Sequence, residues 1–449
     1  MAVSVIQFGQ CGNQIGHSFF STLIKDMEVT KSGVSSSQNQ SYVKNGLDQW
    51  FFKSNDKDSL KARAVLVDTE KKVIDEIYQK HSSKGTWSYD SQSVSLQSGG
   101  AGNNWALGFQ KKGPAMLENV LECLRRQAEE CDRLSTIINL LSTAGGTGSG
   151  VGSYCIENMR DEYPTKTIAS AVVLPFEDGE VVTQSYNTVL TLSKIYNVCD
   201  GTFLFSNDHL QKMASNLLLL KDVNIMDLNS LIAQKMCAVF QVQTDNNPTC
   251  VKISDILCHM VPHPAFKFCS IKSSPHIPNE SRRFEGSLRW SILSDHLKRT
   301  LKIHPSDLEG PHLDWELRLP TCIPSAKANY HEFHKCVSNL LITKGSLDAQ
   351  DVNIGSELLD RKLYPSWAPS SFIHYHQSRK FLDLDKFAAL VTNNAQCNKA
   401  LNSTVNKAWK LFTQKAFLHQ YTKFGLFEED FIDTFIKMES IVKNYDGLS

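Results

Sequence analysis

The residues best suited to bind an anion follow the mainly apolar run Thr136 to Leu141, which leads directly into Ser142-Thr143-Ala144-Gly145-Gly146-Thr147-Gly148-Ser149-Gly150. Glycine lacks the Cβ atom that would keep a ligand away from the backbone, and the hydroxyl groups and the free N–H groups of a new helix offer donors to an anion. The alternative is a flexible linker. The apolar run before the glycines and the helical pattern after them favour a strand, a turn and a helix, and so predict a phosphate cradle.

Three further turns carry suitable chemistry, each directly after or near an apolar segment. They are Gly9-Gln10-Cys11-Gly12-Asn13-Gln14, Asp68-Thr69-Glu70 and Gly99-Gly100-Ala101-Gly102-Asn103-Asn104. Ligands of an open α/β sheet bind outside the carboxyl ends of the strands, and paired carboxylates suit Mg²⁺ or its bound waters. Taken alone, Asp68 and Glu70 are more often a solvated strand end. The order of the four turns together is what predicts a nucleotide site.

The elements that must position these turns are short apolar segments that alternate with helical ones. Strands nearly continuous in Val, Ile and Leu are typical of a parallel sheet covered by helices on both faces, so we expect an α/β fold with a parallel, Rossmann-like nucleotide-binding sheet. The predicted strands are 3–8, 64–67, 137–141, 168–174 and 202–205.

The remaining segments predict the parts around this sheet. The polar stretch 31–45 is expected to be a surface loop. A helix after Asn224 places apolar residues on one stripe, typical of a central core helix. An α+β region follows, and 400–412 and 428–445 are amphipathic and helical. We therefore predict a nucleotide-binding domain at 1–224, a core helix at 225–244, an intermediate α+β domain at 245–390 and a C-terminal helical region at 391–449.

Composition narrows the classes of protein. The chain has 449 residues, 41% of them hydrophobic, and 47 acidic residues balance 47 basic ones, so neither a nucleic acid nor an anionic membrane is expected as a partner. No apolar run approaches the ~18 residues that a membrane-spanning helix needs. The 12 cysteines form no CxxC pair, and no signal-peptide pattern opens the chain. We therefore expect the thiols to be reduced in the cytoplasm and the glycosylation sequons at Asn279 and Asn402 to be unused.

These turns resemble the nucleotide loops of the tubulin family, above all Gly145-Gly146-Thr147-Gly148-Ser149-Gly150 together with Gly9 to Gln14 and Gly102-Asn103-Asn104-Trp105. The resemblance runs essentially from end to end. Val261-Pro262-His263-Pro264 and the stretch 415–425 are more similar to delta-tubulins than to alpha or beta forms. The resemblance implies a GTP-binding domain, a core helix, an intermediate domain and C-terminal helices on the outer surface.

The resemblance also implies roles for individual residues. Glu70, and more remotely Asp68, would handle Mg²⁺, and Asn103 would stand near the γ-phosphate of GTP. Asn207 and Asn229 match two amides that read guanine, although without the family Asn207 is more simply a helix cap and Asn229 a polar helix residue. The phosphates would be held by Gln10, Cys11, Ser142, Gly146, Thr147 and Gly148.

Two positions depart from the family pattern at the nucleoside. Gln184 stands where most tubulins have a carboxylate at the ribose, so hydrogen bonding remains and the charge is lost. Ile225 stands where an aromatic ring usually stacks on the base. Loss of an aromatic stack costs roughly 0.5 to 1.5 kcal/mol, up to about tenfold in affinity, so binding is expected to be weaker but present.

The resemblance implies hydrolysis of GTP only in part. In tubulins an acidic residue of the neighbouring subunit orients the attacking water, and Asp255 matches that position, one methylene shorter than the glutamate of alpha-tubulin. Cys250 and Lys252 replace the usual Asn and Asp, which opposes hydrolysis. Two functions stay open: a structural or regulatory tubulin that binds GTP, and a GTPase timed by assembly.

The expected partners and location follow from the resemblance to delta-tubulins. These are other tubulins, of alpha, beta or other centriolar forms, and centriolar proteins, in the cytoplasm and cytoskeleton, at the centriole or centrosome and at the basal body of the cilium. The chain stops at Ser449 without a glutamate-rich tail, which favours a specialised position over bulk incorporation into microtubules. A dinucleotide-dependent oxidoreductase is disfavoured, because Gly9, Gly12 and Gly16 are not spaced as G-x-G-x-x-G.

Overall fold

The computed structural model describes residues 1–29, 32–53, 59–81, 86–245, 249–278, 288–302, 333–347, 354–368 and 371–448. The chain divides into two compact units. The first unit comprises Met1–Phe20, Gly46–Asn207 and Lys399–Lys443, and the second comprises Ser21–Asn45, Asp208–Asn398 and Asn444–Ser449. The predicted division of the chain into four parts remains a prediction.

The first unit contains a sheet whose paired strands are all parallel. Its order is β6-β4-β1-β7-β8-β9. The strands of the sheet are β1 (Ala2–Phe8), β4 (Ala64–Asp68), β6 (Val94–Leu96), β7 (Leu134–Ser142), β8 (Thr167–Leu174) and β9 (Gly201–Ser206). The five predicted strands and the predicted α/β fold with a parallel sheet are confirmed.

This strand order fixes where a ligand can approach. Counted along the chain, the six strands stand in the order 3-2-1-4-5-6, so the connections leave β1 and β7 in opposite directions. A crevice forms at such a switch point, outside the carboxyl ends of the two strands. The turns that begin at Gly9, after β1, and at Thr143, after β7, are therefore the ones placed to meet a ligand.

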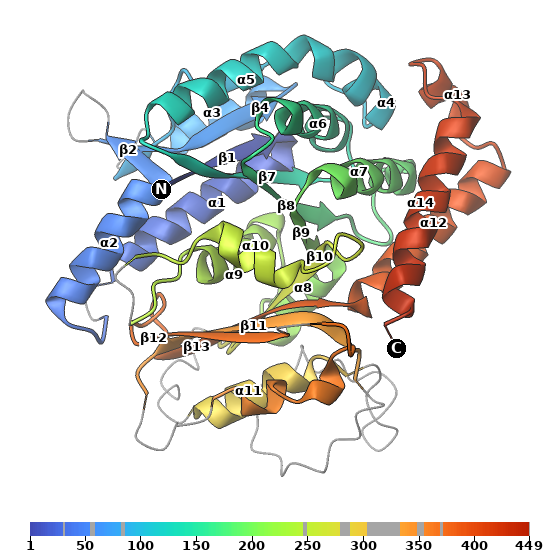
Figure 1. Cartoon of the computed structure of the whole chain (residues 1–449). Helices are drawn as coiled ribbons and strands as arrows, with labels where there is room; N and C mark the ends of the chain where they lie inside the picture. The colour runs from blue at the N-terminus through green and yellow to red at the C-terminus, as the bar shows by residue number, and fades with distance from the viewer. Residues whose placement is uncertain are drawn as a thin grey trace. The chain divides into compact units, whose positions relative to one another are not determined.

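Helices and a second, small sheet complete the first unit (Figure 1). Strands β2 (Phe51–Lys53), β3 (Leu60–Ala62) and β5 (Trp87–Ser88) form the small sheet, and η1 (Gly108–Lys112) and η2 (Thr147–Val151) are single π-helical turns. The helices that lie wholly or mostly in this unit are α1 (Gly9–Met27), α3 (Lys71–His81), α4 (Trp105–Leu107), α5 (Gly113–Glu129), α6 (Gly152–Glu162), α7 (Gln184–Val198), α12 (Asn398–Thr413), α13 (Leu418–Thr422) and α14 (Glu428–Asp446).

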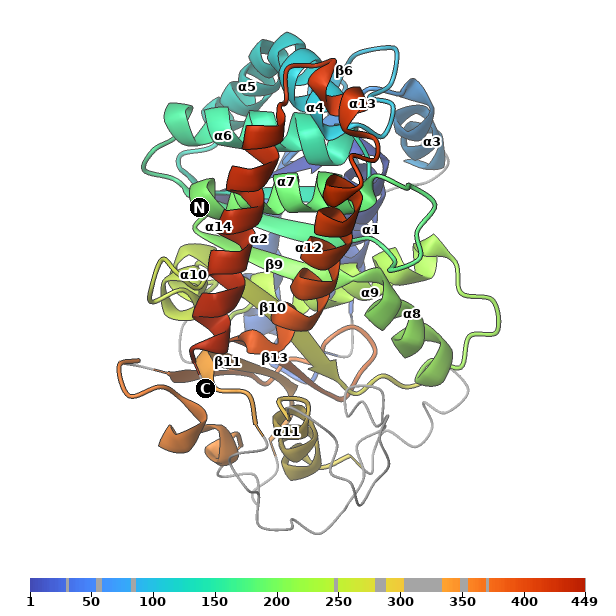
Figure 2. The same ribbon diagram turned by 90° about the vertical axis from the view of Figure 1, so that its right-hand side faces the viewer.

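The predicted C-terminal helices are confirmed as α12 and α14, which lie side by side in Figure 2. Their contact is aromatic: the ring centroids of Trp409 and Phe435 are 4.6 Å apart, and those of Phe412 and Phe431 are 5.9 Å apart. Phe431 also packs edge-on against Tyr186 of α7, at 5.0 Å. These rings join the C-terminal helices to the rest of the first unit.

The second unit contains a mixed sheet in the order β12-β11-β13-β10, made of β10 (Phe268–Ser274), β11 (Cys336–Gly345), β12 (Phe372–Gln377) and β13 (Lys386–Asn394). Strand β13 pairs antiparallel with β10 and β11, and β12 lies parallel to β11. A core of apolar side chains joins the sheet to α11, including Trp290, Leu297 and Leu341. The helices and helical turns of this unit are α8 (Asn207–Asn216), α9 (Ile225–Phe240), α10 (Ile253–Met260), α11 (Trp290–Arg299), η6 (Ser356–Leu358), η7 (Arg361–Leu363) and η8 (Ala395–Cys397).

The helix predicted after Asn224 is confirmed as α9, which ends at Phe240. Asn224 caps it, because its side chain accepts a hydrogen bond from the N–H of Asp227 while the carboxylate of Asp227 accepts one from the N–H of Asn224. This reciprocal capping box fixes the start of the helix. The predicted stripe of apolar residues, from Leu228 to Phe240, is buried.

The surface loop predicted for 31–45 was wrong, because helix α2 (Ser36–Trp50) occupies most of it. The segment is polar and its intrinsic helix propensity is modest, but tertiary packing overrides propensity. In the second unit Tyr42 is 1% exposed and its hydroxyl donates to Asp26 Oδ2 at 2.6 Å, while Trp50 is fully buried in the first unit against Phe19. Two aromatic residues eight positions apart are compatible with one face of a helix.

Across the described residues, none of the helices combines the length and apolar character needed to span a membrane. Every cysteine among the described residues is a free thiol. Asn279, in one of the two sequons, lies outside the described residues, and Asn402 is exposed on α12.

Candidate nucleotide-binding site

The turns after β1 and β7 meet at the switch point. Gly9 has φ +68°, a conformation that favours glycine, and a Cβ there would stand 2.9 Å from the backbone nitrogen of Gly148. A Cβ on Gly148 would in turn stand 3.0 Å from the carbonyl oxygen of Ser142 and 3.2 Å from that of Phe8. The two backbones therefore approach as closely as they do only because both positions are glycine.

The glycine-rich turn opens a helix through the π-helical turn Thr147–Val151. The N–H of Gly150 donates to the carbonyl of Gly146 at 2.9 Å, and the hydroxyl of Ser149 donates to the carbonyl of Gly145. The first N–H groups of a helix have no partner inside it and carry the positive end of its dipole. This end of the turn is therefore suited to an anion such as phosphate.

The acidic turn after β4 lies against the same loop. The hydroxyl oxygens of Thr69 and Thr147 are 2.6 Å apart, and Asp68 Oδ1 accepts hydrogen bonds from the N–H groups of Thr69 at 2.8 Å and Glu70 at 3.3 Å. Burial raises the pKa of Asp68 to about 6, although these hydrogen bonds oppose the shift. A nearby cation would restore the ionised form, while Glu70 is exposed at the surface.

Asn13, on helix α1, links the acidic turn after β4 to the turn after β1. Its side-chain Nδ2 donates to the carbonyl of Gly9 at 2.9 Å and lies 3.4 Å from Asp68 Oδ2. Asn13 is fully buried, and its Oδ1 has no hydrogen-bond partner. Asn13 belongs to the first predicted turn, but the sequence assigned it no role, because its contact with Asp68, 55 residues later, has no local signature.

The loop 99–104 completes the arrangement. Gly99, Gly100, Gly102 and Asn103 all have positive φ. A Cβ on Gly100 would lie 3.4 Å from Glu70 Oε1, and a Cβ on Gly145 would lie 3.5 Å from Asn103 Oδ1. The four turns predicted from the sequence are thus brought together in the first unit.

Asn187 of α7 holds two of these turns in place. Its Nδ2 donates to the carbonyls of Asn103 at 2.9 Å and Ala144 at 2.7 Å, and its Oδ1 accepts from the N–H of Trp105 at 3.0 Å and the hydroxyl of Tyr421 at 2.7 Å. All four hydrogen-bonding positions of the amide are therefore used in a fully buried side chain. This role was not predicted from the sequence. The only signal was an asparagine inside an otherwise buried helix.

The other predicted residues of the first unit lie at the ends of the same elements. Gln10 is exposed and Cys11 half-buried at the start of α1, and burial raises the pKa of the Cys11 thiol to about 12, so the sulfur is not a thiolate. Gln184 begins α7 and its Nε2 donates to the carbonyl of Phe176 at 2.8 Å. Asn207, half-buried, follows β9 directly as the first residue of α8.

Three predicted residues belong to the second unit. Ile225 is 60% exposed at the start of α9. Asn229, one turn along the same helix, is 3% exposed, and its Nδ2 has no hydrogen-bond partner. Asp255 is exposed in the first turn of α10, where Ser254 Oγ lies 3.2 Å from its Oδ1.

The residues present fit a magnesium nucleotide. Two glycine positions let the turns after β1 and β7 approach each other, a helix begins in the second of these turns, and the buried carboxyl of Asp68 lies on the acidic turn that contacts it.

Comparison with known proteins agrees with this geometry. Residues 2–215 match the model of the Tubulin/FtsZ family, GTPase domain. The chain is 34% identical to the tubulin delta chains of Canis lupus familiaris, Homo sapiens and Mus musculus, in each case over 100% of both chains. A GTPase domain of this family implies that GTP or GDP is bound. The chain therefore belongs to the tubulin family.

Proposed function

We propose that this chain is a GTP-binding tubulin that serves as a specialised structural or regulatory component of centrioles and basal bodies, in the assembly or maintenance of triplet microtubules and in the formation of cilia. The observation that carries the GTP-binding part is the meeting of four glycine-rich or acidic turns at the switch point of the parallel sheet. The centriolar part rests on the full-length similarity to delta chains.

Within the first unit, the backbone and hydroxyl groups after β7 would hold the phosphates, together with Gln10 and Cys11 at the start of α1. Residues of the turn after β7 in this role are Ser142, Gly146, Thr147 and Gly148. Asn103 would face the γ-phosphate. Asp68 and Glu70 would hold Mg²⁺, which supplies positive charge against the phosphate oxygens when bound.

Asn207 and Asn229 would read guanine, since an amide can donate and accept along one base edge. Gln184 would contact the ribose. Ile225, being 60% exposed, offers an aliphatic surface to the base in place of an aromatic ring. We expect binding to favour guanine over adenine, at an affinity up to about tenfold below that of a site with the ring.

A second function is assembly-coupled hydrolysis, favoured by one observation. Asp255 is exposed in the first turn of α10, so its carboxylate is accessible to the nucleotide site of a neighbouring subunit. Such a carboxylate would orient or deprotonate the attacking water. The partner would be another tubulin of alpha, beta or centriolar form, and turnover would be slow in the isolated chain.

Two experiments test these proposals separately. Competition between GTP and ATP for the purified chain tests the site: GTP is expected to displace a fluorescent GTP analogue, and ATP is not, whereas equal displacement would contradict the guanine assignment. A tagged chain expressed in ciliated cells tests the location in the cytoskeleton. Signal at centrioles and basal bodies is expected, and even decoration of all cytoplasmic microtubules would contradict the specialised position.

A further inference from the structure

The backbone of Thr69 is held between two of the four turns. Thr69 follows β4 directly and is 1% exposed. Its N–H donates to Asp68 Oδ1 at 2.8 Å, and its carbonyl accepts a hydrogen bond from the N–H of Gly100 at 3.3 Å. The acidic turn and the loop 99–104 therefore fix the position from which the Thr69 side chain extends.

The side chain of Thr69 reaches a third turn, the glycine-rich turn after β7. Its hydroxyl oxygen lies 2.6 Å from that of Thr147, a distance typical of an O–H···O hydrogen bond. A Cβ on Gly9 would lie 3.5 Å from the Cβ of Thr147, so the Thr147 side chain also lies beside the turn after β1. This contact therefore joins the acidic turn to the place where the turns after β1 and β7 meet.

Burial decides the direction of this hydrogen bond. Among the described residues, Thr147 Oγ1 is the partner of the Thr69 hydroxyl. If Thr69 did not donate its proton to this oxygen, a buried donor would be left unpaired, which is costly. Thr69 therefore donates and Thr147 accepts. A hydroxyl that accepts a hydrogen bond still has its own proton to give.

The proton of Thr147 is available at a helix start. Thr147 is the first residue of the π-helical turn Thr147–Val151, and it is half-buried. The first N–H groups of a helix have no partner inside it, so the hydroxyl of Thr147 adds a donor where an anion is already favoured. Because Thr147 accepts a hydrogen bond from Thr69, its own O–H is polarised and becomes a stronger donor.

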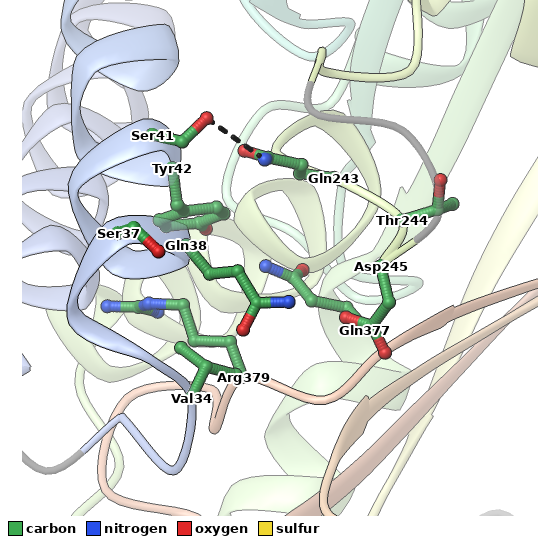
Figure 3. A pocket seen from close by; sticks show the side chains of 10 residues that line it. All are labelled: Val34, Ser37, Gln38, Ser41, Tyr42, Gln243, Thr244, Asp245, Gln377 and Arg379. Atoms are coloured by element: carbon green, nitrogen blue, oxygen red, sulfur yellow. Dashed lines mark hydrogen bonds between the residues drawn. The ribbon is translucent and has the colours of Figure 1, made fainter.

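A hollow of about 230 Å³ in the second unit contrasts with this pair, because its polar groups are already bonded within the protein (Figure 3). Gln243 Nε2 donates to Ser41 Oγ at 3.3 Å. Asp245 accepts the N–H of Ser378 at 3.0 Å and its hydroxyl at 2.5 Å. The Thr69–Thr147 pair, in comparison, keeps one hydroxyl proton to offer to a ligand.

We propose that Thr69 is a positioning residue of the nucleotide site. Its hydroxyl donates to Thr147 Oγ1, fixes the orientation of the Thr147 hydroxyl, and leaves the proton of Thr147 for a phosphate oxygen of the nucleotide. This inference rests on the proposed function, in which Thr147 helps to hold the phosphates. Thr69 itself does not touch the nucleotide.

Titration of the full chain with a fluorescent GTP analogue tests the proposal. Thr69→Ala is expected to weaken binding about three- to tenfold, because Thr147 loses the donor that orients it. Thr69→Ser keeps the hydroxyl and loses only the methyl group, so its affinity is expected to stay within about twofold of wild type. Equal losses in the two variants would overturn the proposal, because they would assign the effect to the methyl group.

A double-mutant cycle tests whether Thr69 acts through Thr147. Thr147→Ala alone is expected to weaken binding about tenfold, since it removes a donor to a charged phosphate. In that background Thr69→Ala should add no more than about twofold, because no hydroxyl is left for Thr69 to orient. The same loss from Thr69→Ala with and without the Thr147 hydroxyl would overturn the proposal. A merely structural role of Thr69 would give that additive result.

Thr404→Ala is the matched control for the loss of a threonine hydroxyl. The hydroxyl of Thr404 donates to the carbonyl of Ala400 within α12 at 2.9 Å, so we expect the affinity for the analogue to stay within about twofold of wild type. If the wild-type chain binds the analogue and Thr69→Ala binds it equally well, this inference is wrong and the proposed function stands. If the folded wild-type chain binds no GTP in the presence of Mg²⁺, the proposed function fails and this inference fails with it.

Discussion

The replacement Asn187→Ala tests whether the candidate site is held in shape before a nucleotide arrives. The amide of Asn187 makes four hydrogen bonds in a fully buried position, two of them to the carbonyls of Asn103 and Ala144. These carbonyls belong to the two turns that approach the predicted phosphate position. Alanine would leave both turns without this common anchor.

The magnitude follows from the number of bonds. Each hydrogen bond contributes about 0.5 to 1.5 kcal/mol net, so the two bonds to the turns are worth about 1 to 3 kcal/mol. If the turns must then be ordered when GTP binds, that free energy is subtracted from binding, and the affinity falls by roughly 5- to 150-fold. The two bonds that Oδ1 accepts, from Trp105 and Tyr421, add to the loss of stability rather than to the loss of affinity.

The assay combines titration of a fluorescent GTP analogue with urea unfolding. Asn158→Ala is the matched control, because Asn158 makes one local hydrogen bond, to the carbonyl of Tyr154 at 2.8 Å. We expect it to change the unfolding free energy by no more than about 0.5 kcal/mol and the affinity hardly at all. An Asn187→Ala chain that is destabilised but binds GTP within about twofold of wild type would refute the argument that Asn187 pre-forms the site.

Three other outcomes are expected. Gly148→Ala should weaken GTP binding, because its Cβ would lie 3.2 Å from a backbone oxygen of β1 and 3.0 Å from one of β7, at a cost of about 1 to 3 kcal/mol. Gly152→Ala, whose Cβ would have its nearest contact at 3.4 Å, should leave binding unchanged. Equal effects of the two variants would count against the close approach of the two turns. Asp255→Asn should leave bound nucleotide unchanged and remove turnover stimulated by partner tubulins, so persistent turnover would exclude a catalytic role. Burial raises the pKa of Asp68 to about 6, so protons compete with Mg²⁺ for this carboxyl at low pH. Retention of GTP at limiting Mg²⁺ should rise with pH, with a midpoint at or below about 6 because Mg²⁺ itself favours the ionised form. Asp68→Asn should abolish this step, whereas an unchanged step would assign it to another group.

The sheet and the turns could be predicted because their signals are local. Strand β8, for example, is buried over nearly its whole length and is correspondingly rich in valine and alanine. At Gly148, beside Thr147, two backbones approach so closely that glycine, which has no Cβ, is the residue type that fits. The turns after the strands are expected to lie close together, because the carboxyl ends of parallel strands lie at the same edge of a sheet.

The residues that hold the turns in place could not be predicted, because they contact residues far away in the sequence. Asn187 contacts Tyr421, 234 residues later, and nothing adjacent to either residue indicates the pairing. The same holds for α2, whose polar sequence favours a loop until Tyr42 is paired with Asp26 and Trp50 is buried. Ile225 and Asn229 were suggested by family resemblance, and their roles remain predictions.

The most direct test of the central claim is to denature the purified chain and identify the nucleotide that it releases. Nearly stoichiometric guanine nucleotide is expected: GTP would indicate a site without its neighbour's carboxylate, and GDP would indicate completed hydrolysis or exchange. Release of an adenine nucleotide, or of none from a folded chain to which GTP and Mg²⁺ had been added, would contradict the account of the four turns as a GTP site.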